Sequence, residues 1–187
     1  MRLIRQRQST PFIAWKNGGG VTQELLAWPT AQRWGVRLSL ATIDKDGPFS
    51  SLAGISRWFT VIEGSGVDLN LDGQTKTVRL GDAPLPFDGS QNCEATLLEG
   101  SVTAFNVMMS DQWAGCVQRI QSPGSVSFSR EGYIGLFGLE PCKVEFEQVE
   151  LQLEKDSLLW QPINSPCSLA VHAGVLIAVH AWPSVEA

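Results

Sequence analysis

Histidine is scarce in this sequence, and the only two, His172 and His180, both lie in its last part. They stand eight residues apart and form no His-x-His pair, so the closely spaced imidazoles of a typical transition-metal site are missing. Carboxylates alone can hold a hard cation, but the Asp and Glu residues form no cluster of that kind. We therefore expect no metal ion and no other cofactor.

Motifs of covalent catalysis are also missing. There is no Gly-x-Ser-x-Gly motif, and no cysteine stands in an activating context. Widely spaced cysteines in a cytosolic chain are buried thiols more often than disulfides or zinc ligands. These absences favour a protein that is not an enzyme, and they leave catalysis by a histidine or a carboxylate open. The cysteines concerned are Cys93, Cys116, Cys142 and Cys167.

Excess positive charge and long apolar runs are lacking as well. The net charge of −5 argues against a nucleic-acid surface, which is usually basic. No apolar run approaches the ~20 residues of a membrane-spanning helix, and residues 1–7 are charged, without the apolar core of a signal peptide. We expect a cytoplasmic protein that binds neither membranes nor nucleic acid. The sequence leaves open whether the protein forms a homodimer.

Helical periodicity is absent, whereas short strands and turns are frequent. In residues 67–71 apolar and polar side chains alternate, which is typical of a half-buried strand. Asp72-Gly73 tolerates the positive φ angles of a tight hairpin turn, and residues 75–80 return as a second strand rich in β-branched side chains. The order of strands and turns in residues 57–89 predicts an all-β, antiparallel jelly roll and resembles a cupin barrel.

The strand pattern repeats along the chain. A shift of 74 residues brings Gly64 onto Gly138 and Asn106 onto His180, and the apolar positions between them agree. The sequence therefore predicts two similar β-modules that form one bicupin-like unit. We expect the first module at residues 1–110 and a second, shorter one at residues 111–187.

A glycine-rich segment, Lys-Asn-Gly-Gly-Gly at residues 16–20, lies between two predicted strands. Dinucleotide and P-loop motifs need a helix after their glycines, but a β-branched segment follows here. One interpretation is an ordinary hairpin turn. The other is that bare backbone lets a ligand approach while Lys16 and Asn17 supply polar contacts.

Further polar side chains interrupt strands. Residues 34–43 alternate so that Arg37 and Ser39 share the face with small side chains. Arg37 is either a surface charge or a buried cation that needs an anionic partner. Asn106 is the one strongly polar residue in the apolar strand 102–108, and it is either a satisfied core amide, an edge position or a ligand contact.

Together with Arg57, which opens a strand after a turn, these residues suit an organic anion, since a guanidinium can bind a carboxylate through two hydrogen bonds. We expect a small anionic metabolite, such as a dicarboxylate, as the partner. The predicted ligand-binding residues are Lys16, Asn17, Arg37, Ser39, Arg57 and Asn106.

Several of these blocks resemble the HutD/Ves family, namely residues 15–24 (WKNGGGVTQE), 34–43, 46–57 and 105–108 (FNVM). The resemblance implies a bicupin-like protein without an established enzymatic activity. HutD is associated with bacterial histidine-utilisation operons, where it is proposed to restrain expression by binding an intermediate such as formylglutamate. Leu52 stands where the family commonly has Phe, and the intact glycine triplet favours HutD over Ves.

The sequence and the resemblance together predict a non-enzymatic, carboxylate-binding protein that regulates histidine utilisation. One alternative is a metal-free cupin enzyme, such as an isomerase or lyase, that acts on a small organic acid. Another is a protein-interaction module, in which side chains would fill the pocket.

The scarcity of histidine yields a direct test. The purified protein should carry no stoichiometric transition metal, because no set of closely spaced ligands is present to hold one. Elemental analysis that finds about one iron, zinc, nickel or manganese per chain would contradict this expectation.

Overall fold

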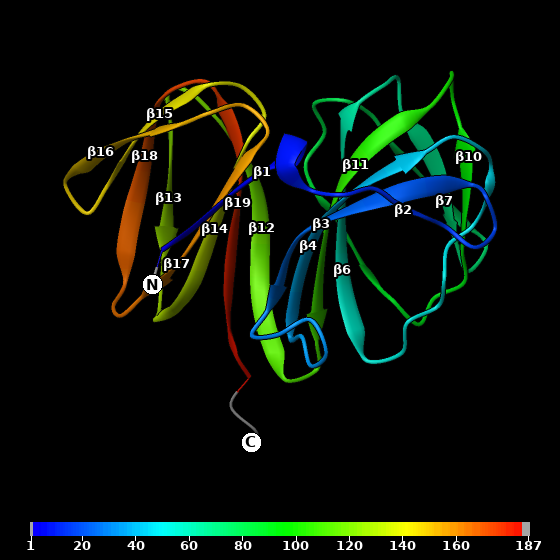
Figure 1. Cartoon of the computed structure of the whole chain (residues 1–187), viewed down its shortest axis with the longest axis horizontal. Coiled ribbons are helices and arrows are strands. Elements are labelled where there is room, and N and C mark those ends of the chain that lie inside the picture. Colours follow the sequence, from blue (N-terminus) through cyan, green and yellow to red (C-terminus); the bar gives the residue numbers. More distant parts are fainter. Residues whose placement is uncertain (1, 185–187) are drawn as a thin grey trace. The chain divides into compact units, whose positions relative to one another are not determined.

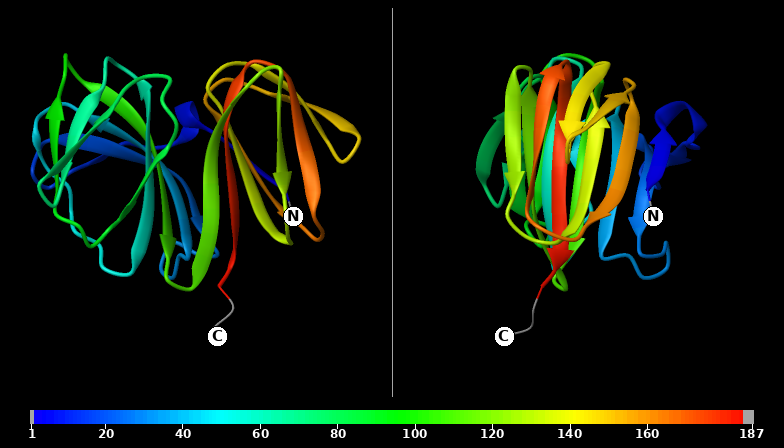
Figure 2. Two further views of the ribbon diagram at one scale, coloured as in Figure 1. Left: turned by 180° about the vertical axis from the view of Figure 1, so that it is seen from behind. Right: turned by 90° about the vertical axis from the view of Figure 1, so that its left-hand side faces the viewer.

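The computed structural model describes residues 2–184, in which antiparallel β-strands dominate and no α-helix occurs. No helix in this part of the chain is long and apolar enough to cross a membrane. The chain forms two compact units (Figure 1), and in each the strands curve around an interior (Figure 2). The first unit is Pro11–Gln112, and the second combines Met1–Thr10 with Trp113–Ala187. The predicted all-β class is confirmed.

The first unit consists of a six-stranded sheet, in the order β2-β3-β4-β11-β6-β9, and a four-stranded sheet, in the order β5-β10-β7-β8. Its strands are β2 (Ile13–Ala14), β3 (Gly20–Trp28), β4 (Val36–Ile43), β5 (Gly47–Pro48), β6 (Ile55–Glu63), β7 (Val67–Leu71), β8 (Gln74–Val78), β9 (Leu85–Asp88), β10 (Cys93–Leu97) and β11 (Val102–Ser110).

The second unit has a five-stranded sheet, in the order β1-β17-β14-β19-β12, and a four-stranded sheet, in the order β13-β18-β15-β16. Its elements are β1 (Leu3–Gln6), the short 3-10 helix η1 (Arg7–Ser9), β12 (Trp113–Gln121), β13 (Gly124–Phe128), β14 (Gly132–Gly138), β15 (Cys142–Phe146), β16 (Val149–Leu153), β17 (Ser157–Ile163), β18 (Cys167–Ala173) and β19 (Val175–Pro183).

The predicted hairpin of β7 and β8 is confirmed. Val67, Leu69 and Leu71 are buried, whereas the polar side chains between them point outward. Asp72 (φ 50°) and Gly73 (φ 89°) make the turn, as a two-residue hairpin loop requires. The buried side chains of this hairpin pack with those of β6, β10 and β11, so each unit encloses its own apolar core.

The predicted repeat is confirmed at the level of strand pairing. A shift of 74 residues carries β11 onto β19 and β6 onto β14, and each pair of strands is antiparallel and adjacent. The hairpin of β7 and β8 likewise corresponds to that of β15 and β16. Asn106 and His180 therefore occupy equivalent places in the two units.

The N-terminus corrects the expected division at residue 110. β1 does not belong to the first module, because it pairs with β17 of the second unit, Leu3 opposite Trp160. A backbone hydrogen bond from Arg7 N to Asp156 O (2.9 Å) continues this attachment. Pro11, which has no N–H to give to a sheet, then separates β1 from β2, and the other boundary falls after Gln112.

Gly64 ends β6 in a conformation that favours glycine, with φ +93°, and a Cβ atom there would meet the Ser101 carbonyl oxygen at 2.5 Å. Gly81 has a similar φ of +97° but open space around it. We expect Gly64→Ala to lower the free energy of unfolding by about 1–3 kcal/mol more than Gly81→Ala, since only the former adds a backbone clash to the shared strain. Urea titrations of the two variants measure the difference. Equal losses would contradict it.

Candidate functional site

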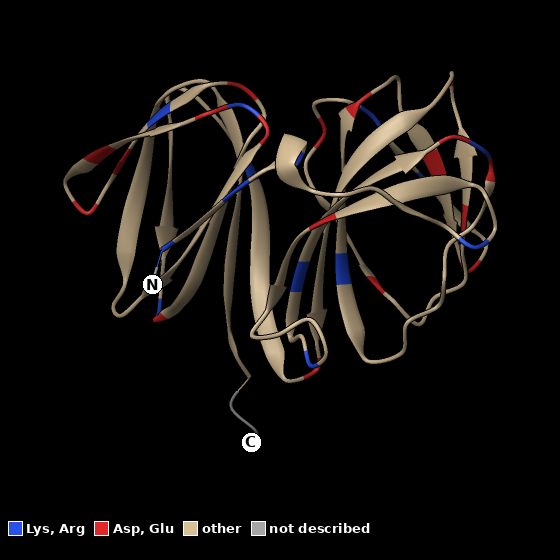
Figure 3. Ribbon diagram, viewed as in Figure 1, with Lys and Arg blue, Asp and Glu red and all other residues tan. Residues whose placement is uncertain are grey.

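A cavity of about 450 Å³ lies within the first unit, and all six predicted ligand-binding residues line it. The sheet strands β4, β6 and β11 supply four of them, and the glycine-rich segment between β2 and β3 supplies the other two. Blue bands on β4 and β6 in Figure 3 mark basic positions within these strands. The cavity is of the size that proteins use for small organic ligands.

Strand register explains why distant residues meet here. Met108 on β11 stands between Arg37 on β4 and Arg57 on β6, so these three form one cross-strand row. Asn106, two residues before Met108, stands opposite Ser39 in the next row. Because side chains alternate between the two faces of a sheet, all five point to the same side.

Arg57 is the most unusual group of the site. Its side chain is only 5 % exposed, and burial lowers the pKa of its guanidinium. Within the described part of the chain, the guanidinium of Arg57 makes one long hydrogen bond, 3.5 Å from Nη1 to the Ser50 carbonyl oxygen, and its Nε has no partner. The guanidinium lies over the rings of Phe87 (4.8 Å) and Phe49 (5.4 Å).

No anion of residues 2–184 compensates this charge, since no ion pair joins Arg57 to a carboxylate. The charge of Arg57 is also felt by the nearby thiol of Cys93, but burial raises the pKa of Cys93 to about 11, so the thiol stays neutral. An unpaired buried cation is costly, and contacts with aromatic rings offset only part of that cost. Arg57 therefore presents an uncompensated positive charge to the cavity.

Arg37 differs from Arg57 because it has a partner within the chain. Its Nε donates to Oε2 of Glu24 on β3 at 2.7 Å, and both side chains are about one third exposed or less, at 27 % and 31 %. Of the two interpretations of Arg37, neither holds fully: the residue is half-buried, and Glu24 supplies the anionic partner. The sequence prediction omitted Glu24, although it belongs to the block of residues 15–24.

Two polar side chains lie deep in the cavity wall between the arginines. Ser39 is 3 % and Asn106 4 % exposed, and Oδ1 of Asn106 has no hydrogen-bond partner among residues 2–184. The reading of Asn106 as a satisfied core amide is therefore wrong for its oxygen. A buried acceptor without a donor favours a bound molecule or water that donates to it.

The glycine-rich segment forms part of the rim. Gly18 takes a positive φ of +66°, and Trp15 N donates to Gly20 O at 2.9 Å, so the predicted hairpin turn is confirmed. Asn17 uses its side-chain oxygen within this turn, where it accepts from the Gly19 N–H at 3.1 Å. Lys16 and Asn17 are both exposed, although they also line the cavity.

Apolar walls complete the site, and these the prediction did not include. Trp15 packs edge-on against Phe49, with ring centroids 6.1 Å apart, and its Nε1 donates to Oγ1 of Thr22 at 2.7 Å. Met108 and Leu52 also line the cavity. Their only signal in the sequence is that they fall in or beside the blocks that resemble the HutD/Ves family.

The described part of the second unit does not repeat the row that Arg37, Met108 and Arg57 form in the first. His180, the counterpart of Asn106, is 2 % exposed between the rings of Phe128 and Trp182, and burial lowers its pKa. Where β11 has Met108 between two arginines, β19 has Trp182, which is paired with Ala114 and lies beside Gly132. Neither of these two neighbours carries a charge, although the guanidinium of Arg130 lies over the Trp182 ring, 4.8 Å from its centroid.

The two histidines lie in different surroundings, His180 in the interior and His172 at the surface. His172 lies on the surface and contacts Glu145 at 3.4 Å. Within residues 2–184, no group of three or more His, Cys, Asp or Glu side chains is placed to hold a metal ion. The four cysteines carry raised pKa values because of burial, which keeps them as neutral thiols.

Comparisons with known proteins agree with the resemblance of the sequence blocks to the HutD/Ves family. The sequence model of the HutD family matches residues 6–178. An uncharacterized 21.2 kDa protein of the hutC 3′ region of Pseudomonas putida is 36% identical over 114 residues, 60% of each chain. Protein Ves of Citrobacter koseri is 36% identical over 103 residues, 52% of each. The matched part thus spans between half and two thirds of these curated relatives.

Solved structures establish the fold. HutD from Pseudomonas fluorescens SBW25, in a formate condition, is 25% identical and superimposes with a TM-score of 0.83 over 99% of this chain and 100% of that one. A cupin 2 conserved barrel domain protein from Leptotrichia buccalis is 13% identical, with a TM-score of 0.57 over 92% of both chains. The predicted bicupin-like architecture is confirmed.

The unpaired charge of Arg57 generates a test that needs no ligand. Arg57→Met should raise the free energy of unfolding of the free protein by roughly 1–3 kcal/mol, because a thioether fills the apolar surroundings without a buried charge. Urea titration or thermal melting measures the change.

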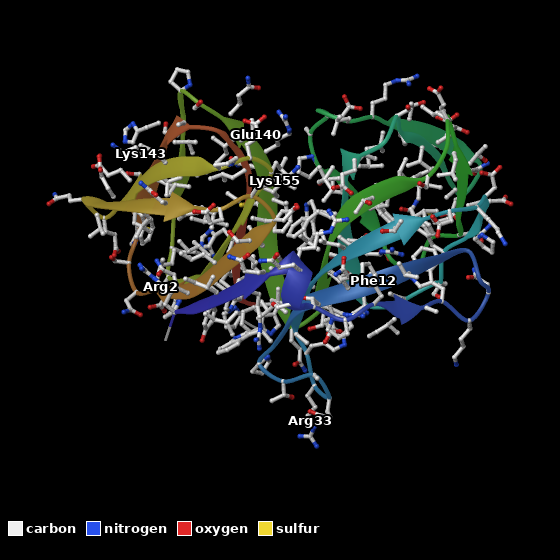
Figure 4. The ribbon with its side chains drawn as sticks, turned by 45° about the horizontal axis from the view of Figure 1, so that its top comes forward. Arg2, Phe12, Arg33, Glu140, Lys143 and Lys155 are labelled. Carbon is white, nitrogen blue, oxygen red and sulfur yellow. The ribbon has the colours of Figure 1, made fainter. Side chains whose placement is uncertain are left out.

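The matched control is Arg33→Met, since the Arg33 side chain projects from the loop between β3 and β4 (Figure 4) and should leave stability unchanged. A folded Arg57→Met variant that is less stable than the wild type would show that the guanidinium is satisfied in the free protein.

Proposed function

The chain belongs to the HutD family, and we propose that its first unit binds a small carboxylate as a metabolite sensor that regulates histidine utilisation. The observation that carries this proposal is the buried guanidinium of Arg57, which faces a cavity and has no anionic partner among the described residues. Charge-assisted hydrogen bonds to a carboxylate would satisfy its donors.

The neighbouring groups fit such a ligand. Ser39 and Asn106 bring hydroxyl and amide hydrogen-bonding groups to the buried wall beside Arg57. Trp15, Phe49 and Met108 offer apolar surface for the body of the molecule. Formylglutamate, the intermediate implied by the family resemblance, is the first compound to test, because its amide and carboxylate groups match this combination.

Binding without turnover is favoured by the composition of the cavity wall. The described lining contains no histidine, cysteine or carboxylate, and its only amine, that of Lys16, is exposed at the rim. His172 and His180, the bases considered for an enzyme, belong to the second unit. A metal-free isomerase or lyase would thus need a general base that the cavity does not supply.

Calorimetric titration with formylglutamate and related acids tests the proposal. Arg57→Ala and Arg37→Ala should each weaken binding at least about tenfold, or ~1.4 kcal/mol, the former by removing the anchoring cation and the latter by leaving the negative charge of Glu24 unbalanced near the cavity. Arg37→Lys should weaken it too, because an ammonium does not reproduce the planar fork.

Lys76→Ala and Arg79→Ala alter exposed cations on or just after β8 and should leave affinity unchanged. Replacing both His172 and His180 should also preserve binding, and NMR should recover the acid chemically unchanged. Product formation that His180→Ala abolishes would support the enzyme instead, and wild-type affinity in a well-folded Arg57→Ala variant would place the ligand elsewhere.

A further inference from the structure

The two arginines of the cavity are unequal in charge. Arg37 and Arg57 flank Met108 in one row, but only Arg37 is neutralised, by Glu24 at 2.7 Å. Arg57 has no carboxylate near it in the described chain. The buried wall therefore presents one uncompensated positive charge, not two.

The position of Glu24 explains why the two arginines differ in charge compensation at the cavity. Glu24 pairs in register with Ser39, one row from Arg37, and is thus on the same face of the sheet as Ser39, although it does not itself line the cavity and acts there through Arg37. A β-bulge follows it, between Glu24 and Leu26, and such irregularities often re-aim a side chain. A second negative group of a ligand, brought to this end of the cavity, would meet an arginine whose charge Glu24 already balances.

We infer that Glu24 sets the charge selectivity of the cavity: one carboxylate binds at Arg57, and the end near Arg37 takes a neutral or N–H-bearing group instead of a second carboxylate. This inference rests on the proposed function. Because Glu24 already neutralises Arg37, a second carboxylate of the ligand gains no uncompensated positive partner at this end and is repelled by the nearby like charge, whereas a neutral carboxamide is not. A dicarboxylate then binds through one of its carboxylates, and the second adds no affinity.

The dimensions of the site allow the alternative that Glu24 suppresses. One strand, β11, separates β4 from β6, so the backbones at Arg37 and Arg57 are about 9–10 Å apart. Long side chains at this spacing reach both ends of a five-carbon dicarboxylate. Without the negative charge of Glu24, both guanidinium groups would be available to such a molecule.

A matched pair of ligands tests the inference. Formylglutamate and formylglutamine differ only in that one carboxylate is replaced by a carboxamide of nearly the same shape. We expect the wild type to bind formylglutamine at least as tightly as formylglutamate in calorimetric titrations. Glu24→Gln removes the charge with little change in size, and it should shift the ratio of the two dissociation constants about tenfold towards formylglutamate.

Three further variants test whether the negative charge of Glu24 causes the shift in the ratio of dissociation constants. Glu94→Gln makes the same change on an exposed position of β10 and should preserve the wild-type ratio. Glu24→Asp retains the charge and should also preserve it, and Glu24→Ala should shift it like Glu24→Gln if the glutamine variant does not fold.

A ratio that both neutral variants leave within about twofold of the wild type would overturn the inference, while the proposed function would stand. If the folded wild type binds neither compound, the proposed function itself fails.

Discussion

The antiparallel register of β11 with β4 and β6 is the constraint on which the candidate site depends. It aligns Arg37, Met108 and Arg57 in one row and Ser39 with Asn106 in the next. Because a shift of one residue would send every one of these side chains to the other face, the register is also what keeps two guanidinium groups in the same cavity. The apolar side chains of β4 on the opposite face, such as Val36 and Leu38, are fully buried and oppose such a shift.

Two units of the same topology use this register differently. In the first unit the row around Met108 contains charged residues, and the wall keeps a buried amide and a buried hydroxyl. In the second unit Trp182 and His180 take the equivalent places, with Ala114 paired to Trp182. Large rings fill the interior there, as the contacts of His180 with Phe128 and Trp182 indicate. The repeat thus preserves the fold, while the interior decides which unit is suited to a ligand.

Arg57 and the pair of Arg37 with Glu24 have different effects on the stability of the free protein and on ligand recognition. Arg57 is a buried cation whose pKa is lowered by desolvation, and burying its charge lowers the stability of the ligand-free protein. A bound anion would offset this cost. The pair of Arg37 with Glu24 does the opposite, because it satisfies one guanidinium internally and removes it from competition for the ligand. Under the proposed function, the unpaired arginine provides affinity and the paired one provides selectivity.

The sequence by itself determined the elements of this protein. Alternation in residues 67–71 and the dipeptide Asp72-Gly73 determined a hairpin, and alternation in residues 34–43 put Arg37 and Ser39 on one face, since strand side chains repeat every two residues. Polar residues in the strands and in the glycine-rich turn were enough to select six of the residues that line the cavity.

Only the tertiary structure decided which strands lie beside one another. Alternation has the same period in every strand and does not encode partners, so neither the pairing of β1 with β17 nor the contact of Glu24 with Arg37 was visible in the sequence. The bulge after Glu24 adds a local shift that no periodic pattern contains. Whether an arginine is neutralised or left unpaired depends on all the groups around it, and those come together only in the folded chain.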